Sequence, residues 1–380
     1  MKVEEQPSIP YIRGLDGLRA LAILLVLFDH WAPWKGTHDI LEFGRSGLLL
    51  FFMLSGYLIT TVLFTLKDKV ECNELSIGQA LKKFYIRRVL RILPVYLFAI
   101  VIAATLLKSV KHDFIFHLLF IQNFSALWAP FMPAYGYATH LWSLAVEEQF
   151  YLLWAPVVLF LIGYKKMTKI CLLAILISII FKIWCSANHS YDAIDYIPRW
   201  TILWTLRLHT VGNIDSLAIG CLIAIDCRYR LVSWDSGFAY QFKKVATFLV
   251  LPIFVVLIGY TEILGFRAAR ATSIYMVLHD LFMQIPFWLL LHHTVHGRGV
   301  PLFENRLLVW IGKKSYGMYI WHEFIKHGAI ILCAQLFNYQ LAPQYSMLSF
   351  VVFISGIFIA AIVSWNFIEA PFLRLKTKWA

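Results

Sequence analysis

Arg19 and His30 are spaced so that both could act on one molecule inside a membrane. They end the stretch "RALAILLVLFDH", residues 19–30, in which nine apolar residues follow Arg19. On an α-helix, eleven steps of about 100° return to within about 20° of the starting direction, about 16 Å further along the axis. A guanidinium suits an anion, and a neutral imidazole suits a general base or a nucleophile. A histidine hydrogen-bonded between helices is the structural alternative for His30.

A second polar group lies in "HLWSLAVEEQFYLLWAP", residues 140–156. Helical spacing of three or four residues places four side chains on one stripe: His140, Ser143, Glu147 and Tyr151. Glu148 points about 100° away. Glu147 is therefore the carboxylate expected to orient His30 or to deprotonate a bound hydroxyl. The polar end of a membrane span, with an aromatic belt at Trp142, is the alternative.

A third group of candidates is basic. In "FYIRRVLRILP", residues 84–94, the guanidinium groups of Arg87, Arg88 and Arg91 recur at i+3 and i+4 and can converge on one anion. We expect them, with Lys82 and Lys83, in a cytoplasmic loop over residues 67–91. The alternative is a flank of snorkelling side chains that serves topology alone.

Two further stretches carry ionisable residues in apolar surroundings. "KKSYGMYIWHEF", residues 313–324, contains His322 and Glu323, of which His322 is a secondary candidate for the site. Arg207 and Asp215 are expected to form a buried ion pair.

Metal binding is not predicted. "HHTVH", residues 292–296, has helical ligand spacing, but it has no carboxylate nearby in the sequence. The six cysteines are scattered without a C-x-x-C pair, which argues against a zinc site or a disulfide framework.

The composition is that of a membrane protein. The 380 residues are 60% hydrophobic and 15% charged, whereas soluble domains are about 45–50% apolar and about 25% charged. Apolar stretches long enough to span a bilayer recur, so we predict one all-α integral membrane domain over residues 1–380, without an appended soluble domain. The expected ten transmembrane helices lie at roughly 17–34, 46–66, 92–108, 141–163, 170–186, 200–225, 245–260, 272–292, 307–336 and 346–367. The segment 114–131 is expected to be re-entrant or interfacial.

The net charge of +12 could indicate a nucleic-acid partner. With the predicted spans, however, most of the 34 Lys and Arg residues fall on the side of the N-terminus. The positive-inside bias then explains the charge and predicts that both termini are cytoplasmic, with no nucleic acid bound.

These features together favour acyl or phosphoryl transfer within a membrane. A proton-coupled transporter with buried His, Glu and Asp is the alternative, although no second copy of any motif indicates an internal repeat. An acyltransferase of the glycerolipid group is disfavoured because no His is followed by Asp five residues later. A non-catalytic scaffold would not need ionisable groups at several membrane depths.

Ordered motifs over almost the whole chain are similar to those of the acyltransferase 3 family of integral membrane O-acyltransferases. This family includes bacterial O-antigen and exopolysaccharide acetyltransferases. The matching segments are "RGLDGLRALAILLVLFDH" at 13–30 with Arg19 and His30 in the family's R-x10-H, "GLLLFFMLSGYLI" at 47–59, "FYIRRVLRILP" at 84–94, "HLWSLAVEEQFYLLW" at 140–154, and more weakly "IDSLAIGCLIA" at 214–224 and "SYGMYIWHE" at 315–323.

The resemblance implies ten core helices in a bacterial inner (cytoplasmic) membrane, acyl-CoA (usually acetyl-CoA) as co-substrate, and no metal. The acceptor would be a hydroxyl of a surface carbohydrate such as lipopolysaccharide O-antigen or exopolysaccharide. We assign catalysis to His30, Glu147 and Arg19, donor binding to Lys82, Lys83, Arg87, Arg88 and Arg91, and acceptor binding to His140, Trp142, Ser143, Tyr151 and His322. Two mechanisms stay open, since His30 could activate the acceptor directly or carry the acyl group first.

Overall fold

The computed structural model describes residues 11–31, 43–106, 110–111, 113–124, 138–161, 163–187, 208–232, 241, 273–296, 300–337 and 347–375. Across these residues the chain is helical and contains no strand. The long helices are α1 (Arg13–Trp31), α3 (Phe43–Glu71), α4 (Ile77–Leu106), α8 (Trp142–Phe160), α9 (Tyr164–Ala187), α11 (Ile214–Tyr229), α14 (Ser273–Val295), α15 (Arg306–Phe337) and α16 (Met347–Ser364). The short elements are α6 (Phe114–Leu118), α17 (Ala370–Arg374), the 3₁₀ turns η1 (Gln122–Phe124), η2 (Thr139–Leu141), η3 (Thr210–Gly212) and η4 (Pro301–Glu304), and the π-helical turn η6 (Trp365–Glu369).

Five helices, α3, α4, α8, α9 and α16 with its extension to Arg374, are long and apolar enough to cross a membrane. Large apolar side chains of α9 such as Leu172, Ile180 and Trp184 are more than half exposed, as expected for a helix surface that faces lipid. The chain is therefore a multi-pass integral membrane protein. Every predicted span that contains described residues overlaps a helix, but in the span 200–225 the α-helix begins only at Ile214, after a 3₁₀ turn, and residues 200–207 lie outside the described residues. The span 245–260 lies wholly outside them. The total of ten and the side of the termini stay predictions.

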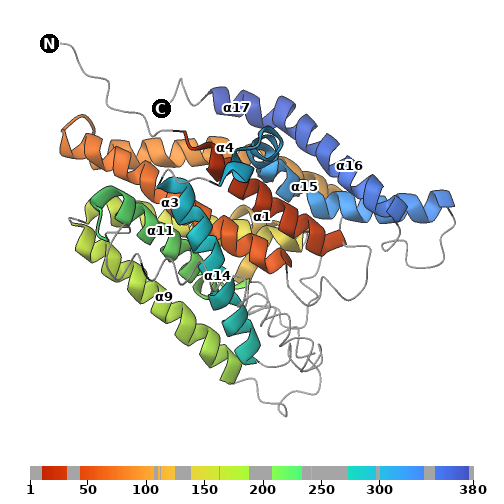
Figure 1. Cartoon of the computed structure of the whole chain (residues 1–380). Coiled ribbons are helices and arrows are strands. Elements are labelled where there is room, and N and C mark those ends of the chain that lie inside the picture. The colour runs from red at the N-terminus through yellow and green to blue at the C-terminus, as the bar shows by residue number, and fades with distance from the viewer. Residues whose placement is uncertain are drawn as a thin grey trace.

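The helices that carry the first candidate residues pack directly on one another. Helix α1 lies against α3 and α15 (Figure 1). Small residues allow the close approach, since a Cβ atom added to Gly312 of α15 would lie 1.8 Å from the Asp16 carbonyl oxygen of α1. Helices α3 and α11 are joined in the same way by Gly56 and Gly220. The backbone positions of α1 and α15 are thereby fixed relative to each other.

The prediction of a loop over residues 67–91 is wrong, because only the turn 72–76 separates α3 from α4. Ser76 and Gln79 form a reciprocal capping box: Gln79 N–H donates to Ser76 Oγ at 3.2 Å, and Ser76 N–H donates to Gln79 Oε1 at 2.8 Å. This cap starts α4 at Ile77, well before the apolar run. The arginines of 84–94 consequently lie on a rigid helix that continues into the bundle.

A buried cluster of charged side chains joins α3, α9, α11 and α14. Arg45 Nη2 lies 2.5 Å from Asp280 Oδ2, and Lys182 Nζ lies 3.0 Å from the same oxygen and 2.6 Å from Asp215 Oδ2. Buried ions are tolerated when they are paired in this way. The predicted partner of Asp215, Arg207, lies outside the described residues. The partner that the structure shows is Lys182.

Candidate active site

A pocket of about 760 Å³, including its open mouth, lies between α1, α3, α4, α8 and α15. Its polar lining combines three arginines, one carboxylate and several hydroxyl groups: Arg19, Arg88, Arg91, Glu147, Ser55, Ser143, Tyr151, Ser315, Tyr316 and Tyr319. Apolar side chains such as Leu48, Phe51 and Ile92 complete the wall. The size and this mixed lining are typical of a pocket for an organic ligand.

The arginines make the pocket suitable for an anion. Arg19 is partly neutralised by Asp16, whose Oδ1 lies 3.2 Å from Arg19 Nη1. The Nε atom of Arg88 is buried and has no hydrogen-bond partner among the described residues. A buried N–H without a partner is costly, so it is commonly satisfied by a ligand. The Arg88 guanidinium is therefore a candidate for holding a phosphate group.

Glu147 is held by hydroxyl groups inside this pocket. Ser55 Oγ donates to Glu147 Oε1 at 2.8 Å, and the Tyr151 hydroxyl donates to Glu147 Oε2 at 2.9 Å. Among the described residues, the partners of the Glu147 carboxylate are thus Ser55 and Tyr151, while His30 is paired with Glu323. That Glu147 orients His30 or deprotonates a bound hydroxyl stays a prediction. Glu147 lines the same pocket as the three arginines.

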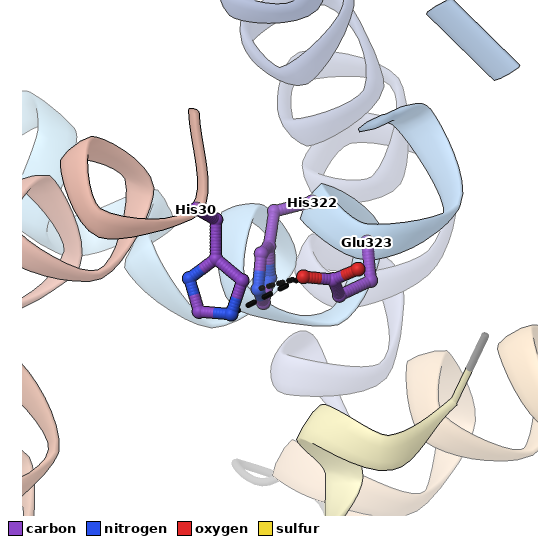
Figure 2. Close-up of side chains that lie close together, drawn as sticks. All are labelled: His30, His322 and Glu323. Atoms are coloured by element: carbon purple, nitrogen blue, oxygen red, sulfur yellow. Dashed lines mark ion pairs between the residues drawn. The ribbon is translucent and has the colours of Figure 1, made fainter. Parts of the chain in front are cut away.

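The carboxylate beside His30 is Glu323 of α15. His30 Nε2 lies 3.2 Å from Glu323 Oε1, and Figure 2 shows the imidazole reaching across from α1 to this carboxylate. His30 Nδ1 lies 2.8 Å from the Val26 carbonyl oxygen one turn earlier, so this nitrogen carries the hydrogen. In the neutral ring, Nε2 then holds the lone pair. Nε2 is also the atom that faces Glu323 Oε1, so a proton taken up at Nε2 during a reaction would be shared with this carboxylate.

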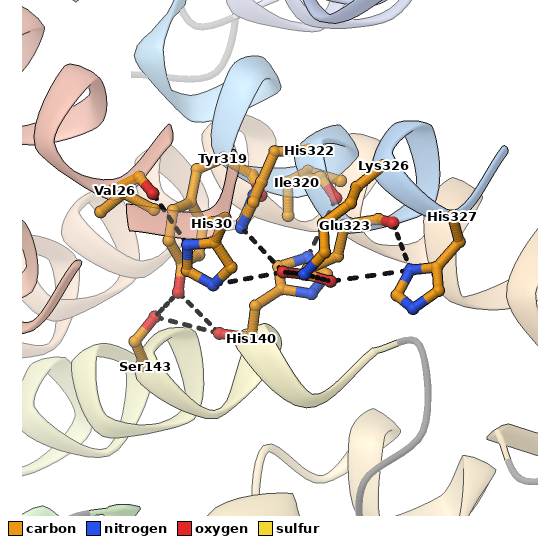
Figure 3. A network of polar contacts seen from close by, with 10 residues as sticks. All are labelled: Val26, His30, His140, Ser143, Tyr319, Ile320, His322, Glu323, Lys326 and His327. Carbon is orange, nitrogen blue, oxygen red and sulfur yellow. Dashed lines mark hydrogen bonds and ion pairs between the residues drawn. The ribbon is translucent and has the colours of Figure 1, made fainter. Parts of the chain in front are cut away.

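Several basic groups surround Glu323 (Figure 3). Lys326 Nζ lies 3.0 and 3.1 Å from its two carboxylate oxygens, and His327 Nδ1 lies 3.6 Å from Oε2. The ring of His322 lies between those of His30 and His140, with centroid distances of 4.8 and 4.7 Å. We call His30, His140, His322 and Glu323 the histidine cluster. It gathers residues from α1, η2 and α15.

Ser143 and Tyr319 connect the pocket with the histidine cluster. Both line the pocket, and their hydroxyl oxygens are 2.6 Å apart. The Tyr319 hydroxyl donates to the His140 carbonyl oxygen at 2.6 Å, and its ring centroid lies 5.3 Å from that of His322. A molecule bound by the arginines therefore has a polar wall leading toward His30.

The structure thus divides the predicted residues into three groups. The pocket gathers Arg19, Arg88, Arg91, Ser143, Glu147 and Tyr151, and the histidine cluster gathers His30, His140 and His322. The third group lies outside both: it contains Lys82, Lys83 and Arg87 of α4, which do not line the pocket. It also contains Trp142, whose ring centroid lies 6.1 Å from that of Phe52. The pairing of Glu323 with His30 was not predicted from the sequence. The signal that could have indicated it is that Glu323 directly follows the candidate residue His322.

Two groups among the described residues have metal-ligand geometry. His30, His322 and Glu323 offer ligand atoms within 4.8 Å of one another, as do Asp226, His292 and His296. In the first group, the Lys326 ammonium occupies both oxygens of the carboxylate and would repel a cation. That group is better suited to holding a proton than a metal ion.

The sequence as a whole matches one family model, the acyltransferase domain, over residues 12–368. The chain belongs to this family of acyltransferases. It is similar to the peptidoglycan O-acetyltransferase OatA of Listeria monocytogenes, with 27% identity over 98% of this chain and 57% of that protein. The O-acetyltransferase OatA of Staphylococcus aureus is 26% identical over 97% of this chain and 58% of its own length. The chain therefore spans less than two thirds of these relatives. No solved structure matches it.

Proposed function

We propose that this protein is a membrane O-acyltransferase that moves an acetyl group from acyl-CoA to a hydroxyl group of a cell-surface carbohydrate. The observation that supports it most directly is the arrangement along α1. Arg19 lies in a basic pocket, and His30, about 16 Å further along the helix axis, meets Glu323. One end of α1 thus provides a group that can bind an anionic donor, and the other end provides a group that can accept a proton.

The arginine pocket suits the phosphate groups of CoA. Arg88 and Arg91 lie one turn apart on α4 and can both donate to one phosphate, while Arg19 faces them from α1. The thioester arm of the donor is long and weakly polar, so it can extend past Ser143 and Tyr319 toward the histidine cluster. The exposed Lys82, with Lys83 and Arg87, lies outside this pocket and can contribute only to the longer-range positive field.

The histidine cluster suits general base catalysis. In the neutral ring, His30 Nε2 takes the proton of the acceptor hydroxyl as its oxygen attacks the thioester carbonyl carbon. The new C–O bond forms, the C–S bond breaks, and the proton passes on to the departing CoA sulfur, which leaves as the thiol. The Glu323 carboxylate stabilises the intermediate imidazolium, and Lys326 keeps that carboxylate ionised. The alternative is an acyl-histidine formed before the acceptor binds.

For the acceptor, the relatives suggest peptidoglycan, because one of them is named a peptidoglycan O-acetyltransferase. Lipopolysaccharide O-antigen and exopolysaccharide stay as the alternatives that the motif resemblance implies. We place the protein in a bacterial inner membrane with both termini cytoplasmic, as the distribution of Lys and Arg predicts. The acceptor would then be reached at the outer end of α1.

The decisive experiment follows acetyl-labelled acetyl-CoA with the purified protein in detergent. Release of CoA should be stimulated by a peptidoglycan or a polysaccharide fraction, and His30→Ala should lower it by about 100-fold or more. His293→Ala, which removes a histidine of α14 that does not line the pocket, is the matched control. Label retained on the wild type and lost in His30→Ala would favour the acyl-histidine route. Uptake of solute into proteoliposomes without CoA release would instead support the transporter.

A further inference from the structure

The second group with metal-ligand geometry lies apart from the candidate active site. Asp226 stands in the last turn of α11, and His292 and His296 stand at the end of α14. Their ligand atoms all lie within 4.8 Å of one another. The carboxylate that is missing from the sequence around 292–296 is therefore supplied by another helix.

The two histidines have the i, i+4 spacing of a helical metal site. Their rings are stacked with centroids 4.1 Å apart, and the His296 backbone N–H still donates to the His292 carbonyl oxygen at 3.2 Å. His296 Nδ1 lies 2.9 Å from the same carbonyl, which fixes the hydrogen on Nδ1 and leaves the lone pair on Nε2. That Nε2 atom faces the Cys227 sulfur at 3.9 Å, a weak hydrogen-bond partner.

Asp226 is also held in place. Its Oδ1 atom accepts the backbone N–H of Val232 at 3.0 Å, which anchors the carboxylate. Metal ligands in proteins are commonly oriented by such additional hydrogen bonds. The nearby cation Arg228 is bound to both oxygens of Asp68 on α3. Its positive charge is thus paired with a carboxylate that is not one of the three candidate ligands, whereas Lys326 is paired with Glu323, which is a candidate ligand of the first group.

Two imidazoles and one carboxylate form a ligand set that zinc uses widely. Bonds of about 2.0–2.2 Å in a tetrahedron place ligand atoms about 3.4 Å apart. The present separations of at most 4.8 Å can close to this value by small side-chain rotations. His292 is buried, whereas His296 is exposed and Asp226 is half-buried. The ion would therefore have access from water and keep one position for a water molecule.

We propose that Asp226, His292 and His296 bind one divalent transition-metal ion, most readily Zn²⁺, which fastens the end of α11 to the end of α14. The same end of α14 supports α1, because a Cβ atom on Gly14 would lie 2.7 Å from the Thr294 side chain. The ion would thus stabilise the bundle at the end where α1 begins, and it takes no part in acyl transfer.

The test uses full-length protein purified without a histidine tag and stripped with a chelator. After addition of Zn²⁺ and removal of the excess, elemental analysis should find one zinc per chain, and the thermal unfolding temperature should rise. His292→Ala and Asp226→Asn should each weaken Zn²⁺ binding by at least about tenfold and abolish the rise. The exposed His296 allows His296→Gln as a gentler variant, whose unfolding temperature without zinc should equal that of the wild type.

Further variants test whether the zinc ion binds at Asp226, His292 and His296 or elsewhere in the chain. His293→Ala removes the neighbouring histidine and should leave both zinc content and the zinc-induced stabilisation unchanged. Loss of zinc in His30→Ala, with retention in His296→Gln, would assign the ion to the histidine cluster and overturn the proposal. Less than stoichiometric zinc in the wild type, or equal binding by wild type and His292→Ala, would also overturn it.

Discussion

His30 Nε2 lies 3.2 Å from Glu323 Oε1, although α1 and α15 stand near opposite ends of the chain. The contact places a carboxylate beside a histidine that shares α1 with Arg19 of the pocket. We therefore expect Glu323, more than Glu147, to determine how fast the acyl group is transferred.

Replacement of Glu323 by Gln removes the charge that stabilises a protonated His30 and keeps the shape. Turnover with acetyl-CoA should fall by about 100-fold or more, while the affinity for CoA stays the same. The measurement is the rate of CoA release beside CoA binding. Glu304→Gln, at an exposed glutamate of η4, is the control and should keep full activity. An equal loss of activity in both variants would contradict the assignment.

Arg88 and Arg87 are neighbours with different surroundings, which makes them a matched pair. Arg88→Ala removes a guanidinium that lines the pocket and has a buried Nε atom, so the KM for acetyl-CoA should rise about 10- to 100-fold. Arg87→Ala should change this KM by less than about threefold, as expected for a surface charge. Steady-state kinetics at one ionic strength measure both. A larger effect of Arg87→Ala would restore the donor role predicted for it from sequence.

Tyr319 holds the wall between the pocket and the histidine cluster. Tyr319→Phe would remove the hydroxyl that contacts Ser143 Oγ and the His140 carbonyl oxygen, each at 2.6 Å. Leaving buried polar atoms without this partner should lower the free energy of unfolding by about 1–3 kcal/mol. Thermal unfolding in detergent detects the change. Tyr85→Phe, which loses one exposed hydrogen bond to Leu152, should shift stability by no more than about 0.5 kcal/mol.

Helix packing predicts opposite effects for two glycines. A Cβ atom on Gly220 would lie 2.0 Å from the Met53 carbonyl oxygen, so Gly220→Ala must push α11 away from α3 and should strongly reduce the yield of folded protein. Gly328 in α15 has nothing within 4 Å of its Cβ position. Gly328→Ala should therefore stabilise the helix by up to about 1 kcal/mol. Size-exclusion profiles and unfolding temperatures compare them, and an unfolded Gly328→Ala would contradict this view of the packing.

Cys72 tests which side of the membrane holds the basic residues. It is exposed in the turn between α3 and α4, which the positive-inside bias places in the cytoplasm. In bacterial cells, a membrane-impermeant maleimide should label it only after the inner membrane is permeabilised. Cys72→Ser identifies the labelled band. Equal labelling of intact cells would reverse the predicted topology.

The sequence alone determined the class of protein and much of the first candidate site. Apolar length and composition indicated a multi-pass helical protein, because a helix that crosses a bilayer needs a continuous apolar run. Helical periodicity placed Ser143, Glu147 and Tyr151 on one stripe, and all three line the pocket. Ordered motifs indicated the acyltransferase family, which the match over residues 12–368 shows. Local rules sufficed here because each concerns residues within a few turns of one helix.

The tertiary structure decided which helices meet, and hence which side chains become partners. Glu323 faces His30, Lys182 pairs with Asp215, and Asp226 joins His292 and His296. In each case the partners lie on different helices, and no spacing in the sequence links one helix to the other. The start of helix α4 at Ile77 could have been predicted, since the capping box of Ser76 and Gln79 is visible in the sequence. Periodicity fixes the face of a helix on which a residue lies. The residue opposite it depends on packing between distant segments, where small residues such as Gly312 permit close contact.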